Sequence, residues 1–313
     1  LAGWPGVKPW WLIALPSALT LPFIVDIIHL GQPNLALLVP MLAGFALLQR
    51  DRQWSAGAAF ALAAAVKAFP ITVLPYLLWR RRWRAAASMI AALVILLVVV
   101  PAPIRGFDRN LSELKTWFDG MVLSTDEQGF GQRPEENWSW KNNSLIAVTH
   151  RLLRPVNAMQ NNRAAEPLYV NLANLSYRQV NLVLAILCGL IGAGFCVLLP
   201  AEQRRTPRSD AAEYGLLLCL MTMASPLARS YYFVWLLFPI TVLTYRAALI
   251  DVARERRIAI GALGFAAALF AIGPLFWPRH PAEAAGSWLW ASCAIAAALA
   301  WALRRDAAPA PAS

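Results

Sequence analysis

Polar side chains that could bind a phosphate or a sugar stand out because most of the sequence around them is apolar. Lys67 lies in the run LAAAVKAFPITVL, residues 62–74, which otherwise offers nothing to water. The other polar groups form three stretches, HLGQPN (29–34), NWSWKNNSL (137–145) and SPLARSYY (225–232). Cations stabilise phosphate charge, and amides and hydroxyls hydrogen-bond to sugars. Together these groups predict a ligand site if the fold gathers them on one face.

Two cations in this set need an explanation. An uncompensated lysine at the centre of a membrane helix costs about 2.5–3.5 kcal/mol on insertion, and less near the interface. Lys67 therefore predicts a partner or an anionic ligand such as a phosphate, and the alternative is that its side chain extends to the outer headgroups. Arg229 leaves the same two choices open, an anionic ligand or lipid phosphates. Tyr231 and Tyr232 suit either sugar stacking or an interfacial aromatic belt.

The composition places these residues in a membrane protein. Hydrophobic residues make up 59% of the 313 residues and charged residues 14%, with apolar runs from one end to the other. Many of the 14 tryptophans fall near the ends of these runs, where the ring suits the headgroup layer. The net charge of +11 comes mainly from basic residues in the short connections between apolar runs. It therefore indicates membrane orientation and contact with anionic lipids, and we expect no nucleic-acid partner.

The apolar runs predict an all-α fold, a polytopic membrane bundle of about ten helices or half-helices in one domain, residues 1–313. Long helices are expected near 10–28, 33–49, 84–101, 178–199, 211–226, 231–246, 257–274 and 287–303. Segment 55–79 is interrupted by Lys67 and Pro70 and has basic residues on both flanks. If both flanks are cytoplasmic, the segment enters the membrane and returns as a hairpin, with Lys67 near the tip.

Basic clusters separated by an outward and a return pass predict the orientation. They are Arg50 with Arg52, residues 80–84, residues 204–208, residues 246–257, and Arg304 with Arg305. The positive-inside rule assigns these corners to the cytoplasm. The longest polar segment, 102–177, then becomes one extracytoplasmic loop, and residues 304–313 a disordered cytoplasmic tail.

We expect no metal and no cofactor. Cys188, Cys196, Cys219 and Cys293 fall inside predicted membrane helices, without metal-ligand spacing, and are interpreted as small buried hydrophobic residues. The three histidines are scattered, and the sequence contains no phosphate-binding glycine loop.

Three stretches resemble glycosyltransferase family 87, whose members belong to the C-type glycosyltransferase superfamily. GQPNLALLVPMLAGFALLQRDRQWSAGAAFALAAAVKAFPITVLPYLLWRRRWRAA (31–86) looks like the family's core signature. KNNSLIAVTHRLLR (141–154) is similar to its N-x-S-L segment, and ASPLARSYYFVWLLFPI (224–240) resembles its S-P turn before an aromatic helix. The family more often has Gln at the position of Asn143, and Trp and His at those of Arg229 and Tyr231.

The resemblance implies a membrane enzyme that takes a sugar, often mannose or arabinose, from a polyprenyl-phosphate carrier. The acceptor would be a hydroxyl of a lipid or glycan on the extracytoplasmic face, and together with the Ala/Arg-rich style the family suggests a bacterial plasma membrane. The implied mechanism is an inverting single displacement, with a carboxylate base and cations around the departing phosphate. Lys67, with Arg151 or Arg229, would meet the phosphate. Gln32, Asn34, Asn143 and Ser144 would hold sugar hydroxyls or pin the loop.

The catalytic base is the feature of the family that residues 1–313 do not match directly. In the superfamily the acid lies in the first extracytoplasmic loop, and we expect the chain to begin beyond that loop. Asp26, inside the predicted helix 10–28, is the candidate substitute, and the alternative is a helix-end acid with a cationic partner. Asp108 and Glu113, early in the outer loop, are weaker candidates. If the upstream loop supplies the base, residues 1–313 alone should be inactive.

Two other classes of protein remain open at this point. An intramembrane lysine and a proline-broken hairpin also suit a transporter, although a transporter usually shows paired repeats and charges near the midplane. A non-catalytic membrane scaffold, with Lys67 only as an anchor, is the third interpretation.

Overall fold

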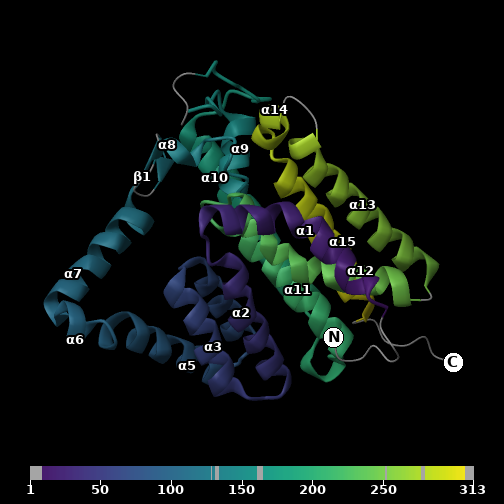
Figure 1. Ribbon diagram of the computed structural model, residues 1–313, viewed down its shortest axis with the longest axis horizontal. Helices are drawn as coiled ribbons and strands as arrows, with labels where there is room; N and C mark the ends of the chain where they lie inside the picture. Colours follow the sequence, from purple (N-terminus) through teal and green to yellow (C-terminus); the bar gives the residue numbers. More distant parts are fainter. Residues whose placement is uncertain are drawn as a thin grey trace. The chain divides into compact units, whose positions relative to one another are not determined.

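The computed structural model describes residues 9–127, 129–130, 134–160, 165–250, 252–275 and 279–306, and these are mostly helical (Figure 1). The strand pairing found among them is a single pair of two-residue strands, β1 (Thr125–Asp126) and β2 (Gly129–Phe130). The prediction of an all-α fold is confirmed. The chain divides into two compact units, residues 1–32 with 138–313, and residues 33–137.

Five of the described helical segments are long and apolar enough to cross a membrane. They are Trp11–Leu30, Trp83–Arg105, Tyr177–Leu198, Ser230–Leu249 and Ser287–Asp306. Asn34–Gln49, Gln53–Val66 and Phe69–Trp79 are apolar but shorter. The protein is thus a membrane protein, whereas the predicted count of about ten membrane helices is not confirmed.

The smaller unit, residues 33–137, consists mainly of short helices. In order, they are α2 (Asn34–Gln49), α3 (Gln53–Val66), η1 (Phe69–Thr72), α4 (Val73–Trp79), α5 (Trp83–Val94), η2 (Ile95–Val99), α6 (Ala102–Arg105), α7 (Phe107–Phe118), η3 (Asp119–Leu123) and α8 (Pro134–Asn137). The segment predicted as the first part of a long loop therefore contains helices.

The predicted break in segment 55–79 is present. Helix α3 ends at Val66, and Lys67 has an extended backbone with φ −147° and ψ 123°. The chain then makes the 3₁₀ turn η1, which contains Pro70, before α4 begins. Arg82, just after α4, lies 3.7 Å from the carboxylate of Asp51, just before α3. The two ends of the segment therefore lie together, as a hairpin requires.

Helices α3 and α5 approach each other closely because Gly57 has no side chain. A Cβ atom at this position would lie 2.2 Å from the carbonyl oxygen of Ala85 and 2.8 Å from the backbone nitrogen of Met89. The Ser88 hydroxyl also donates to the carbonyl oxygen of Trp54, at 2.7 Å. Small residues and hydroxyl groups are the usual means by which helices associate within a membrane.

The larger unit combines long and short helical segments. They are α1 (Trp11–Leu30), α9 (Leu145–Leu153), α10 (Tyr177–Leu198), η4 (Glu202–Arg204), α11 (Pro207–Ala224), η5 (Ser230–Leu236), α12 (Leu237–Leu249), α13 (Ala253–Leu275), α14 (Arg279–Ala284) and α15 (Ser287–Asp306). Figure 1 shows α1, α12, α13 and α15 beside one another, and α12 packs on both α1 and α13. Phe23 of α1 joins them through edge contacts with Phe270 and Trp288, at ring-centroid distances of 5.0 and 5.5 Å.

A buried arginine gathers four helix ends of this unit. Arg246, at the end of α12, forms ion pairs with Glu255 at the start of α13 and Asp306 at the end of α15. It also donates to the carbonyl oxygen of Arg208 at the start of α11, at 3.3 Å. The basic clusters of this unit therefore lie at one end, which we call the basic end.

Two predicted boundaries differ from the structure at this end. Helix α11 begins at Pro207, earlier than the predicted 211, because Thr206 and Ser209 form a capping box and proline suits the first helical position. Residues 304–306, predicted to begin a disordered tail, form the last turn of α15. Residues 307–313 lie outside the described residues.

Gly57→Ala should lower the melting temperature of the detergent-solubilised protein. The added methyl group would meet backbone atoms of α5, which cannot move aside as a flexible side chain can. Gly261→Ala is the matched control, because a Cβ atom at that α13 position meets nothing within 4 Å, and alanine favours helix by up to about 1 kcal/mol over glycine. Equal melting temperatures for the two variants would contradict the close approach of α3 and α5.

Candidate active site

Two of the predicted polar stretches meet in the larger unit. The side-chain nitrogen of Asn142 donates to the carbonyl oxygen of Pro226 at 3.0 Å, and its oxygen accepts from the backbone N–H of Ala228 at 2.9 Å. The backbone N–H of Asn143 donates to the carbonyl oxygen of Ala228 at 2.8 Å. Asparagine suits this position because its amide supplies a donor and an acceptor together. The loop before α9 is thereby fixed to the turn after α11.

This contact lies at the end of the unit opposite the basic end. Arg151 reaches the carbonyl oxygen of Ala284, just before α15 begins, whereas α15 ends beside Arg246. A helix of 20 residues is about 30 Å long. Polar groups therefore occupy the two ends of the helices, with apolar packing such as that of Phe23 between them.

Arg151 is the central connection of this end. It is fully buried, and it donates to the carbonyl oxygens of Ala284 at 2.7 Å, Ser139 at 2.7 Å and Asn142 at 2.8 Å. Burial lowers the pKa of the guanidinium to about 9, so the group is still charged at neutral pH. These bonds give Arg151 a positioning role, because its donors point at the backbone of the loop.

Asn143 and Ser144 are buried beside this connection. The side-chain nitrogen of Asn143 donates to the carbonyl oxygen of Trp140 at 3.2 Å, whereas its buried side-chain oxygen has no hydrogen-bond partner within the described residues. That oxygen is an acceptor that a ligand hydroxyl could satisfy if the loop moved. Ser144 caps α9, and its hydroxyl oxygen accepts from the backbone N–H of Ala147 at 3.1 Å.

The turn after α11 carries the next two candidates. Arg229 is half-buried and immediately precedes η5. Tyr232 is buried, and its ring lies against that of Tyr231 with a centroid distance of 5.2 Å. Both candidates therefore lie close in sequence to Ala228, which Asn142 and Asn143 bind.

Asp26 and Gln32 belong to the last part of α1. Asp26 is half-buried, one turn after Phe23, whose ring lies 5.7 Å from that of Phe233 in η5. Gly31 ends the helix with φ +60°, and the backbone N–H of Gln32 closes the turn on the carbonyl oxygen of Ile27 at 3.0 Å. The end of α1 that carries these two candidates is thus the end that packs on η5.

Lys67 and Asn34 form a pair in the smaller unit. The ammonium of Lys67 donates to the side-chain oxygen of Asn34 at 2.8 Å. Asn34 is fully buried and is the first residue of α2. Lys67 has a polar partner here, and the two residues were both expected to contact the ligand.

His150 is a neutral member of the network next to Arg151. Burial, and secondly the positive charge of Arg154, lower the pKa of the imidazole to about 4. The guanidinium of Arg154 can only donate, so at 3.2 Å it binds an unprotonated Nδ1. The proton of the neutral ring is then on Nε2, which donates to the side-chain oxygen of Asn181 at 3.1 Å.

Sequence reasoning missed two residues at this end. Asn142 was passed over in favour of its neighbour Asn143, although it is Asn142 that binds the turn through both side-chain atoms. Glu283, next to Ala284, is a fully buried carboxylic acid between two apolar helices. An acidic residue in a short connection between two apolar helices is the sequence feature from which Glu283 could have been predicted. Among the described residues, no group of three His, Cys, Asp or Glu side chains could hold a metal ion.

The fold is that of an integral membrane protein with a candidate polar site at one end of its helices. A comparison with protein families shows to which family it belongs. The family model of glycosyltransferase family 87 matches residues 2–226, which include Lys67, Asn142 and Arg151. The chain therefore belongs to glycosyltransferase family 87, as the three sequence stretches indicated, and is a membrane glycosyltransferase. No curated protein and no solved structure matches it.

Arg151→Lys and Arg151→Met should both lower the melting temperature strongly. Neither side chain can serve all three carbonyl oxygens, and a buried group left without its hydrogen bond costs about 1–3 kcal/mol. Arg178→Met is the control, since Arg178 is exposed at the start of α10. Normal stability of Arg151→Lys with lost activity would instead favour direct contact between Arg151 and a substrate phosphate.

Unfolding of the protein should become easier between pH 6.5 and about 4 because of His150. In this range the unfolded chain takes up a proton that the buried, folded imidazole does not, so the free energy of unfolding falls as the pH falls. The wild type should thus lose more stability than His150→Gln between pH 7.5 and 4.5. His29→Gln, which changes an exposed histidine, should behave as the wild type does. Parallel pH profiles for wild type and His150→Gln would show that His150 is not held neutral.

Proposed function

We propose that this protein moves a sugar, mannose or a similar hexose, from a polyprenyl-phosphate carrier to an acceptor hydroxyl. The observation that carries the proposal is the match to glycosyltransferase family 87 over residues 2–226. The acceptor is a lipid or a glycan, and the reaction is an inverting single displacement on the extracytoplasmic face. The same match weighs against the transporter and the scaffold.

The proposed orientation follows from the two ends of the larger unit. Lys and Arg are favoured on the cytoplasmic side of membrane helices, and the corners around Arg205, Arg246 and Arg256 lie at the basic end. We therefore assign the basic end to the cytoplasmic side of a bacterial plasma membrane. The end held together by Arg151 then faces outward, where the sugar-bearing headgroup is found.

If residues 1–313 supply the general base, we propose Asp26 for that role, and a base from an upstream loop is the alternative. A base must reach the acceptor hydroxyl, and Asp26 is half-buried near the end of α1 that packs on η5. Glu113 is less suited, because hydrogen bonds from Arg109 lower the pKa of its carboxyl group. Glu283 is fully buried, which separates it from an incoming acceptor. Asp108 remains the second choice, in the first turn of α7.

Lys67 is the proposed cation for the carrier phosphate. Its hydrogen bond to Asn34 orients the ammonium and leaves its charge intact, since an amide is neutral. Arg229, half-buried before η5, is the proposed second cation. The carrier phosphate carries one negative charge in the donor and gains a second as the sugar leaves, so fixed cations both bind the donor and lower the barrier. Arg151 acts indirectly, by fixing the loop.

The sugar is assigned to the side chains around the fixed loop. Gln32, set by the turn at Gly31, and Asn143, through its unpaired oxygen, are the proposed partners of sugar hydroxyls. Tyr232 is the proposed sugar-stacking ring. Ser144 pins the loop by capping α9.

The test is transfer of label from a radiolabelled polyprenyl-phosphate sugar in membranes that contain the full-length protein. Asp26→Asn should reduce the turnover rate by roughly 10²–10⁴-fold. Lys67→Ala should raise the KM for the donor, and Lys67→Arg should recover part of the affinity because it retains the charge. Asp108→Asn tests the second choice and should leave the rate unchanged if Asp26 is the base, and Asp119→Asn, an exposed acid of η3 with no proposed role, is the matched control.

If the label stays on the carrier in wild-type membranes, the proposal that the protein is a glycosyl-transferring enzyme is wrong. Uptake of the labelled compound into proteoliposomes without transfer would point to a transporter. Full activity of Asp26→Asn would move the base to another carboxylate and leave the transfer reaction itself in place.

A further inference from the structure

A long apolar cavity follows the helices of the larger unit on its basic side. It has a volume of about 470 Å³ and lies between α1, α12 and α13. Trp11, Leu15 and Leu19 line it from α1, and Ile260, Leu263 and Gly264 from α13. Small residues create the hollow: a Cβ atom added at Gly264 would meet nothing within 4 Å. The space is therefore not filled by neighbouring side chains of the described residues.

The depth of this groove matches one leaflet of a bilayer. Its lining on α13 extends from Arg256 to Ala267, and eleven helical steps amount to about 16 Å. The hydrocarbon core of a bilayer is about 30 Å thick, so each leaflet contributes about half of that. An acyl chain that entered at the basic end would lie along the groove.

The mouth of the groove is positively charged. A second hollow of about 460 Å³ shares Ala248, Arg256 and Ile260 with the groove and adds Arg257. Both arginines are exposed. Of the described carboxylates of this end, Glu255 and Asp306 are engaged by Arg246, and Glu202, Asp210 and Glu213 lie beside Arg205. Asp251 lies outside the described residues. The exposed arginines of the mouth therefore present positive charge to an anion.

We propose that the groove binds an anionic glycerophospholipid of the leaflet at the basic end. One acyl chain fills the apolar part between α1 and α13, and the phosphate sits between Arg256 and Arg257. Basic pockets between membrane helices are a recurrent kind of site for anionic headgroups. The bound lipid would fill the space that small residues leave between α1, α12 and α13, and would contact all three helices.

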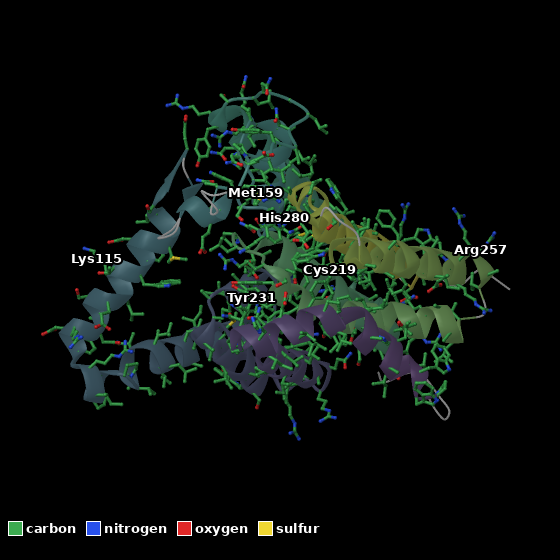
Figure 2. The ribbon with its side chains drawn as sticks, turned by 45° about the horizontal axis from the view of Figure 1, so that its top comes forward. Lys115, Met159, Cys219, Tyr231, Arg257 and His280 are labelled. Carbon is green, nitrogen blue, oxygen red and sulfur yellow. The ribbon has the colours of Figure 1, made fainter. Side chains whose placement is uncertain are left out.

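Within the larger unit, the mouth of the groove and the segment that Arg151 holds lie at opposite ends of the helices. Figure 2 labels Arg257 near one end of α13 and His280 beyond its other end, next to the segment that Arg151 holds. The inference therefore does not depend on the glycosyltransfer mechanism. It depends on the groove and on the charge at its mouth.

The experiment is native mass spectrometry of the detergent-solubilised full-length protein, titrated with phosphatidylglycerol and, separately, with phosphatidylcholine of the same chains. The wild type should bind one phosphatidylglycerol in preference to phosphatidylcholine. Arg256→Gln and Arg257→Gln should each weaken the binding of phosphatidylglycerol by about fivefold. Arg254→Gln is the charge-matched control, because Arg254 is exposed on the same turn and lines neither hollow.

A second pair of variants locates the acyl chain. Gly264→Leu fills the groove and should abolish the preferred site, whereas Gly261→Leu, equally open but outside the lining, should leave it intact. Dihexanoyl phosphatidylglycerol, which has the headgroup without a long chain, should bind much more weakly. Melting temperatures of both glycine variants verify that they are folded.

Equal binding of the two lipids by the wild type would overturn the proposal, as would equal effects of the Arg254 and Arg256 variants. Unchanged binding in Gly264→Leu would place the lipid elsewhere. Preferred binding of a polyprenyl phosphate at the groove, or its closure by a second copy of the chain, would also overturn it.

Discussion

The candidate active site depends on the hydrogen bonds that the buried guanidinium of Arg151 donates to backbone carbonyl groups. A charged group inside a protein is costly unless its hydrogen bonds are satisfied. Arg151 meets this condition through carbonyl oxygens of Ser139, Asn142 and Ala284. The stretch from Ser139 to Arg151 is thereby connected to Ala284, 133 positions further along the chain. The position of the loop before α9 therefore depends on the end of α14.

A second buried arginine performs a different task at the other end of the same helices. Arg246 is satisfied by the carboxylates of Glu255 and Asp306, so it neutralises charge as well as joining helix ends. Arg151 is bound by neutral carbonyl groups instead, and its positive charge is not cancelled by the partners named here. A field of that kind at the proposed outer face would favour an anionic headgroup nearby.

The smaller unit shows how a broken helix can present a cation. A continuous helix through 53–79 would place the ammonium of Lys67 among apolar side chains, at a cost in free energy. The extended backbone at Lys67 ends α3 there, and the hydrogen bond to Asn34 gives the ammonium a polar neighbour. Gly57 allows α3 to lie directly against α5, so the helix that ends at the break is held by close packing on its neighbour.

The sequence predicted local features well, because they depend on neighbouring residues. Apolar runs gave the helices, Pro70 with Lys67 gave the break, and the spacing of basic residues predicted the corners that meet around Arg246. The capping box at Thr206 was also readable from the sequence, yet the apolar run alone placed the start of α11 too late. The resemblance to the family could be found from contiguous stretches such as 31–86 and 141–154 for the same reason.

By itself, the sequence determined that this is an all-α membrane protein of the glycosyltransferase family 87 type, with its polar groups in short stretches. Only the tertiary structure decided which of these groups touch. Asn142 and Pro226 are 84 positions apart, and Arg151 and Ala284 are 133 apart. No periodicity extends over such distances, because hydrogen bonds between remote segments depend on how helices pack. The same packing, through small side chains on α12 and α13, left open the groove that ends at Arg256.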